Sequence, residues 1–178
     1  MRFENVSICS VAHIDASHRV TSAELEARLE APMKRLGVMP GLLEGLSGIK
    51  ARRMWDEDYQ PSQAATAAAV VAIERAGISR DRIGVLINTS VCRDYIEPST
   101  ACLVHGNLEL GRHCLNFDLG NACLGFINGM EVVGNMIERG QLDYGLVVDG
   151  ENSRFVVDST IERQIGRASC RERVSSPV

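Results

Sequence analysis

Apolar residues lie in short runs along this chain, and these runs alternate with stretches of helical periodicity. Continuous apolar runs near residues 83–88, 114–119 and 144–149 predict buried strands, and a further strand is expected at 6–13. Because strands alternate with helices, the pattern predicts an α/β fold with α-β-α layers around a mixed, mostly parallel sheet.

Capping and stop signals place the helices between these strands. Thr21 and Glu24 have the spacing of a capping box, which predicts a helix to about residue 36 that Pro32 kinks or ends early. Farther along, Pro61 begins an alanine-rich helix and Gly77 stops it. Three more elements are expected: a short strand at 48–54, a helix from about 98, and a long helix at 123–138.

The chain divides into a folded part and a tail. Residues 1–163 carry the periodic pattern, and 178 residues with 45% hydrophobic content allow one globular unit with its own core. Residues 164–178 are polar and have no period. We interpret them as a non-native-looking, disordered tail of the kind that translated adapter sequence produces; the alternative is a disordered natural terminus.

Charge and hydropathy exclude several classes of function. A net charge of −4 with mostly scattered Lys and Arg leaves no basic face, so nucleic acid is not an expected partner. No apolar run reaches the roughly 18 residues that a membrane-spanning helix needs, and the first residues lack the pattern of a signal peptide. We therefore expect a cytoplasmic protein with no membrane span.

The chain contains six cysteines. None is spaced as part of a metal-ligand set, and no glycine-rich phosphate motif of useful specificity occurs, so neither a metal nor another cofactor is expected. Since nothing indicates an oxidising compartment, most of the cysteines are expected to be reduced and buried, including Cys9, Cys102 and Cys114.

Cys123 has a distinctive setting, because it follows a predicted strand and a tight turn at the start of a long apolar helix. Unpaired N–H groups and the dipole at a helix amino terminus favour a thiolate there. The small neighbours Gly120, Ala122 and Gly125 leave space for a substrate carbonyl. This is the arrangement of a nucleophile elbow with cysteine as the nucleophile. The alternative is that Cys123 is only a small core residue.

Four segments resemble the β-ketoacyl synthase III branch of the thiolase superfamily, in the same order and spacing. They are residues 47–53 (SGIKARR), 98–102 (PSTAC), 117–126 (FDLGNACLGF) and 144–150 (YGLVVDG). Within that branch, residues 88–100 (NTSVCRDYIEPST) are most similar to the olefin-pathway acyl-CoA condensing enzymes, the OleA type. The resemblance implies that residues 1–163 are the amino-terminal half of a thiolase-like fold, truncated before its second half.

The resemblance also implies a mechanism. Cys123 takes an acyl group from acyl-CoA as a thioester, and the α-carbon of a second acyl unit then attacks that thioester. In the olefin-pathway type the second unit is another long-chain acyl-CoA, which Glu97 deprotonates as a base reaching into the partner subunit of a homodimer. The His and Asn that complete such a site lie in the family's second half, so the fragment alone is expected to be inactive.

Three interpretations of function stay open. The first is the acyl-CoA condensing enzyme. The second is a β-ketoacyl-ACP synthase III of fatty-acid biosynthesis, which uses malonyl-ACP; such synthases carry Trp and Arg for coenzyme A where this chain has Leu42 and Leu46. The third is a non-catalytic, truncated gene product. For Glu97 itself, the alternative is a solvated residue placed favourably at a helix start.

Overall fold

The computed structural model describes residues 2–152, and these residues form two compact units. One unit combines residues 2–14 with 58–152, and the other comprises residues 15–57. The predicted boundary at residue 163 and the tail beyond it lie outside the described residues.

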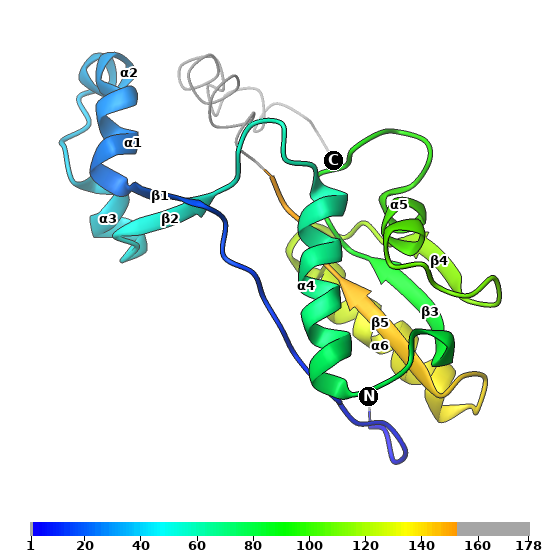
Figure 1. The fold of residues 1–178 in the computed structure, drawn as a ribbon. Coiled ribbons are helices and arrows are strands. Elements are labelled where there is room, and N and C mark those ends of the chain that lie inside the picture. Colours follow the sequence, from blue (N-terminus) through cyan, green and yellow to red (C-terminus); the bar gives the residue numbers. More distant parts are fainter. Residues whose placement is uncertain (1, 153–178) are drawn as a thin grey trace, which may run out of the picture. The chain divides into compact units, whose positions relative to one another are not determined.

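The larger unit is built on a three-stranded parallel sheet in the order β4-β3-β5. Its strands are β3 (Ile83–Asn88), β4 (Leu115–Asp118) and β5 (Tyr144–Val148), which confirms the strands expected at these positions. Figure 1 shows the three arrows side by side and pointing the same way. Parallel pairing therefore brings the carboxyl ends of all three strands to one edge of the sheet.

Helices cover both faces of this sheet, which confirms the expected α-β-α layers (Figure 1). On one face lie α4 (Pro61–Ala76) and α5 (Thr100–Asn107), whose apolar residues pack with Leu86 of β3. On the other face lies α6 (Gly125–Glu138), which packs through Val133 against the opposite side of β3. None of the helices within residues 2–152 is long and apolar enough to cross a membrane.

The stop signals of the larger unit act as the sequence predicts. Gly77 ends α4 in the left-handed conformation at φ 65°, which glycine adopts at little cost. A short 3-10 turn (Arg80–Arg82) then leads into β3. At the start of α5, Ser99 Oγ accepts a hydrogen bond from the Cys102 N–H at 3.2 Å, which caps the helix.

The smaller unit joins a two-stranded antiparallel sheet to three short helices. β1 (His18–Thr21) pairs with β2 (Ala51–Met54), and α1 (Ser22–Arg28), α2 (Glu30–Leu36) and α3 (Leu42–Ser47) lie between them in the chain. β2 confirms the short strand expected there, whereas the sequence pattern does not predict β1.

The capping box at the start of α1 is confirmed. Thr21 Oγ1 accepts a hydrogen bond from Glu24 N at 3.1 Å, and Thr21 N donates to the Glu24 carboxylate at 2.6 Å. The helix that follows is broken, but at Leu29 and not at Pro32. Pro32 lies in the first turn of α2, where the N–H that it lacks would have no helical partner. The single helix expected here is therefore two helices.

The strand expected at residues 6–13 is absent, because this segment has no ladder partner among the described residues. It runs beside α4 instead (Figure 1), where Ser10 Oγ donates to Ala72 O at 2.6 Å and Arg75 Nη1 donates to Val11 O at 3.2 Å. An apolar run indicates that a segment can be a strand, but only a neighbouring backbone makes it one.

The sequence of the Cys123 helix is apolar around much of its circumference, which predicts a helix buried on most sides, but the structure buries only one side of it. The buried residues of α6 include Gly125, Gly129 and Val133, whereas Leu124 and Ile127 near its start are each 59% exposed. A sheet covers only one side of a helix that packs on it. Within residues 2–152, no second layer covers the other side of these first turns.

Candidate active site

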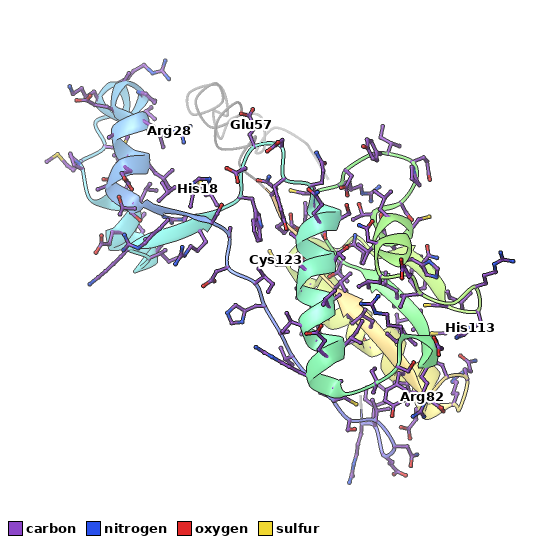
Figure 2. The ribbon with its side chains drawn as sticks, viewed as in Figure 1. His18, Arg28, Glu57, Arg82, His113 and Cys123 are labelled. Atoms are coloured by element: carbon purple, nitrogen blue, oxygen red, sulfur yellow. The ribbon has the colours of Figure 1, made fainter. Side chains whose placement is uncertain are left out.

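Cys123 lies where β4 passes into α6, at the carboxyl edge of the sheet (Figure 2). Leu119 N donates to Asn88 O at 2.8 Å, which continues the ladder to the end of β4. The chain then turns through Ala122, whose φ of 43° is uncommon for a residue with a side chain. Cys123 occupies a 3-10 turn (Ala122–Leu124), so the α-helix begins two residues later than predicted. The thiol is exposed, as a nucleophile must be.

Two glycines let the start of α6 approach the ends of the neighbouring strands. A Cβ at Gly125 would lie 3.1 Å from Thr89 O, and a Cβ at Gly129 would lie 2.9 Å from Val147 Cγ1. A larger residue at either position would push the helix outward. The close approach therefore holds the Cys123 turn against the carboxyl edge of the sheet.

A buried polar network joins the three strand ends beneath this turn. Asn88 Nδ2 donates to Asp118 Oδ1 at 3.1 Å, and Ser90 Oγ donates to Asn88 Oδ1 at 2.6 Å. Ser90 Oγ in turn accepts a hydrogen bond from Gly150 N at 2.7 Å. Asp118 also accepts hydrogen bonds from the first N–H groups of α5, at 3.1 and 2.8 Å. Since buried polar groups that are all paired rigidify a site, the network supports the turn.

Glu97 lies in the loop of residues 89–99, which connects β3 to α5. Its side chain is exposed, and within the described part of the chain no hydrogen bond or ion pair holds the carboxylate. The neighbouring Tyr95 and Ile96 are exposed as well, Ile96 to 89%. Among the described residues, no hydrogen bond joins the Glu97 carboxylate to the Cys123 thiol.

The other cysteines of the described residues differ from the sequence prediction. Cys114 is buried as expected, and burial raises the pKa of its thiol. Cys9 and Cys102, however, are exposed, so the expectation that they are core residues is wrong. Cys9 lies in the segment that forms no strand, and Cys102 lies on the outer side of α5, whose inner side carries Ala101 and Val104.

None of the four histidines hydrogen-bonds to Cys123. His105 hydrogen-bonds to Gly111 O at 3.2 Å and His113 to Asp81 O at 2.8 Å, so both rings have backbone partners. His18 pairs with Asp56 at 2.6 Å in the smaller unit. Figure 2 shows His113 at the opposite end of the sheet from Cys123.

Sequence reasoning did not identify two carboxylates that support the Glu97 loop. Asp94, within the loop, accepts hydrogen bonds from Ser62 and Thr100, and Glu151, just after β5, accepts from the backbone of Val91 and Cys92. A polar residue shortly after a buried strand is the signal that could have drawn attention to Glu151, which follows the end of β5 by three positions. Asp94 gives no comparable signal in the sequence.

Residues 117–169 match the 3-oxoacyl-[acyl-carrier-protein (ACP)] synthase III family. The chain is 54% identical over 163 residues to the acyl-CoA:acyl-CoA alkyltransferase of Xanthomonas campestris, a match that covers 92% of this chain and 48% of that protein. It is 38% identical to the alkyltransferase of Shewanella oneidensis over 93% of this chain and 47% of that protein. The β-ketoacyl-ACP synthase III of Anaplasma marginale is 35% identical over 64% of this chain and 35% of that protein.

Solved structures agree with these matches. The cerulenin-bound OleA of Xanthomonas campestris superposes with a TM-score of 0.87 at 53% identity, covering 92% of this chain and 47% of that one. A structure of the same protein with a glutamate replaced by glutamine superposes with a TM-score of 0.86 at 53% identity, covering 92% of this chain and 47% of that one. A structure with a cysteine replaced by alanine also superposes with a TM-score of 0.86, at 50% identity, covering 97% of this chain and 50% of that one. The chain spans about half the length of the curated relatives it matches.

Proposed function

Because the chain belongs to the 3-oxoacyl-[acyl-carrier-protein] synthase III family of thiolase-like condensing enzymes, we propose that its parent protein joins two long-chain acyl-CoA molecules. The observation that carries this proposal is the exposed Cys123, held at a strand-to-helix turn on the carboxyl edge of the sheet. The parent protein, completed to the length of its relatives, is called the full-length protein below.

The first step is acyl transfer to Cys123. The thiolate attacks the carbonyl of acyl-CoA, the bond from that carbonyl to the coenzyme A sulfur breaks, and coenzyme A leaves as a thiol after taking up a proton. The thiol is exposed in the turn that leads into α6, where a substrate carbonyl can reach it. The product is an acyl-Cys123 thioester.

The second step forms the carbon–carbon bond. Glu97 removes a proton from the α-carbon of a second acyl-CoA, and the resulting carbanion attacks the carbonyl of the acyl-Cys123 thioester. The carbon–sulfur bond to Cys123 then breaks, which returns the thiolate and releases a β-ketoacyl-CoA. No oxidant or reductant is needed, because the reaction is a Claisen condensation.

Two observations support Glu97 as the base. Its carboxylate projects from an exposed loop and is not engaged by any group in residues 2–152. In the solved structures of the Xanthomonas protein, the substituted glutamate and cysteine are separated by the same number of positions as Glu97 and Cys123. As the resemblance to the olefin-pathway type implies, we assign Glu97 to the site of the partner subunit in a homodimer.

The test of this assignment is Glu97→Gln in the full-length protein. The variant should still form the acyl-Cys123 thioester, detected as a mass increase of the intact protein, while condensation falls by about 10²- to 10⁴-fold. Mixing Glu97→Gln with Cys123→Ala subunits should restore part of the activity, because a mixed dimer contains one site with both groups. If Glu97→Gln condensed at the wild-type rate and mixing restored no activity, Glu97 would not be the base but only a solvated residue at a helix start.

The remaining catalytic groups are assigned to the other half of the protein. The family's mechanism needs a His and an Asn, and none of the four histidines here hydrogen-bonds to Cys123. In the Xanthomonas structures a substituted histidine lies farther beyond the cysteine than this chain extends beyond Cys123. This spacing supports a site completed by the second half.

A second candidate function is β-ketoacyl-ACP synthase III activity with malonyl-ACP. It is favoured by the family match at residues 117–169 and by relatives of that name at 35–36% identity. In this reaction loss of CO₂ from malonyl-ACP generates the carbanion, so no base at Glu97 is needed. Product analysis with acyl-CoA alone and with added malonyl-ACP separates the two functions, since only the first condenses acyl-CoA alone.

A third candidate is a non-catalytic, truncated gene product. The intact Cys123 turn argues against loss of function in the parent protein, although the chain by itself lacks the His and Asn. The cysteines of the described residues are all unpaired, which suits the reducing cytoplasm, where we place the reaction.

A further inference from the structure

The loop that carries Glu97 is fixed at its base by two carboxylates. Near its start, Glu151 accepts hydrogen bonds from two consecutive backbone N–H groups, from Val91 at 2.5 Å and from Cys92 at 3.1 Å, one on each carboxylate oxygen. At its centre, Asp94 accepts from Ser62 Oγ at 2.7 Å and from Thr100 Oγ1 at 3.3 Å. The loop is thus tied to the end of β5 and to the starts of α4 and α5.

The part of the loop beyond these anchors projects into solvent. Residues 95–98 are exposed, and nothing within the described residues holds the Glu97 carboxylate itself. The position of that carboxylate therefore depends on the backbone that leads to it, and this backbone is set by the two anchors.

The surroundings of Glu151 show that it serves the loop. Burial, a hydrogen bond to Glu151 and the charge of Glu151 raise the pKa of the Cys92 thiol to about 11. Cys92 consequently stays protonated near neutral pH and donates to Glu151, so it joins the two N–H groups as a third donor. Hydrogen bonds to a charged acceptor are stronger than those between neutral groups, which makes this anchor firm.

We infer that Glu151 is a positioning residue for Glu97, acting by holding residues 91 and 92 at the end of β5. The inference rests on the proposed function, in which Glu97 is the base for the second step. A base displaced by about 1 Å can lose on the order of 10²-fold in rate. Glu151 thus acts through Glu97 and not on the substrate itself.

Glu151 allows a cleaner test than Asp94. Asp94 accepts hydrogen bonds from residues at the starts of α4 and α5, so its replacement would destabilise two helices that pack in the core. Within residues 2–152, the hydrogen bonds that Glu151 accepts all come from the loop. Its replacement should therefore alter the loop with little effect on the sheet.

The experiment is Glu151→Gln in the full-length protein. Formation of the acyl-Cys123 thioester should stay within about twofold of wild type, while kcat for condensation falls about 10- to 100-fold with little change in KM. Glu151→Asp keeps the charge but shortens the reach, and it should show a smaller loss of the same step. It also keeps the inference testable if Glu151→Gln folds poorly.

Two controls separate positioning from general stability. Glu138 accepts backbone hydrogen bonds from Glu4 and Asn5 at 3.2 and 3.0 Å, far from the loop in sequence, so Glu138→Gln should leave both steps unchanged. The double variant Glu97→Gln/Glu151→Gln should condense no more slowly than Glu97→Gln alone, because Glu151 acts only through Glu97.

Different failures have different meanings. If Glu97→Gln abolishes condensation but Glu151→Gln does not slow it, the inference is wrong and the proposed function stands. Equal losses of acyl transfer and condensation in Glu151→Gln, or a further loss in the double variant, would make Glu151 merely structural. If Glu97→Gln itself condenses normally, the proposed function fails, and the inference fails with it.

Discussion

The described cysteines share one functional group but differ in their surroundings. Cys92 and Cys114 are disfavoured as thiolates, because burial raises the pKa of both thiols. Cys9 and Cys102 are exposed but lie, respectively, in an extended segment and in a helix that Ser99 already caps. Cys123 combines exposure with a place in the 3-10 turn that leads from β4 into α6. Exposure alone therefore does not distinguish the nucleophile.

This difference predicts the order of alkylation in the full-length protein. Brief treatment with iodoacetamide near pH 7 should modify Cys123 first, since its thiol is exposed in the turn before a helix, a setting typical of reactive cysteines. Cys92 and Cys114 should react last. Peptide mass spectrometry at several times gives the order, and Cys123→Ala should remove the fast phase while Cys102→Ala leaves it. Faster labelling of Cys9 or Cys114 than of Cys123 would contradict the assignment of the nucleophile.

Among the elements, α6 depends on the absence of side chains at its inner face. Gly129 approaches Val147 and Thr89 so closely that an added Cβ would lie 2.9 Å from Val147 Cγ1 and 3.1 Å from Thr89 Cγ2. Both neighbours have branched side chains that cannot easily move aside. The element that carries Cys123 is thus placed by glycine packing.

We predict that Gly129→Ala destabilises the full-length protein by about 1–3 kcal/mol, the usual cost of overpacking a core. Gly106 in α5 is the matched control, because nothing lies within 4 Å of a Cβ added there. Gly106→Ala should be neutral or stabilise by up to about 1 kcal/mol, since alanine favours helix. Denaturant unfolding measures both, and a Gly129→Ala variant as stable as Gly106→Ala would refute the close packing.

In the smaller unit, α1 holds the start of α3 through one carboxylate. Glu26 accepts hydrogen bonds from Gly41 N at 2.6 Å and from Leu43 N at 2.7 Å. The bonds from Leu43 and Gly41 hold the pKa of Glu26 below its ordinary value of 4.5. A lowered folded-state pKa means that the stabilisation is present above the unfolded-state pKa and is lost as the pH falls through the folded-state pKa.

Acidification should therefore release the start of α3. We expect hydrogen exchange of the Gly41 and Leu43 amides, corrected for intrinsic rates, to lose protection as the pH falls below about 4.5. Glu26→Gln should remove this pH dependence because its amide does not titrate, whereas Glu44→Gln, an exposed change in α3, should keep it. The local amides are the proper readout, since the pKa of Glu24 in the same unit is also lowered. If Glu26→Gln and wild type showed the same pH dependence, the hydrogen bonds to the Glu26 carboxylate would not be its cause.

For the whole molecule, the described residues leave apolar surface and strand edges uncovered. β4 and β5 each pair only with β3, and Leu115 on β4 is 57% exposed. Leu124 and Ile127 are exposed beside Cys123. Unpaired edges and apolar patches favour association with further chain.

The 178-residue chain, expressed as given, should therefore self-associate and show no condensing activity. Light scattering and gel filtration should find aggregates, and assays with long-chain acyl-CoA should find no β-keto product. Leu115→Lys places a charge at the open edge of β4 and should reduce self-association without restoring activity. Turnover by a purified monomer of this chain would overturn the prediction.

Local signals in the sequence determined much of the larger unit. The apolar runs placed β3, β4 and β5, and Pro61 and Gly77 placed the ends of α4, because burial and capping act between residues close in the chain. The motif around Cys123 predicted the strand-to-helix turn for the same reason: its turn, its small residues and its helix start are contiguous.

Tertiary structure decided what depends on neighbours distant in the chain. It left residues 6–13 without a strand partner, exposed Cys9 and Cys102, and buried only one side of α6. It also tied the Glu97 loop to Glu151, about 60 positions away. Periodicity in the sequence shows which side chains can be buried. The surface that covers them, and the pairing of carboxylates with N–H groups, are set only when distant segments come together.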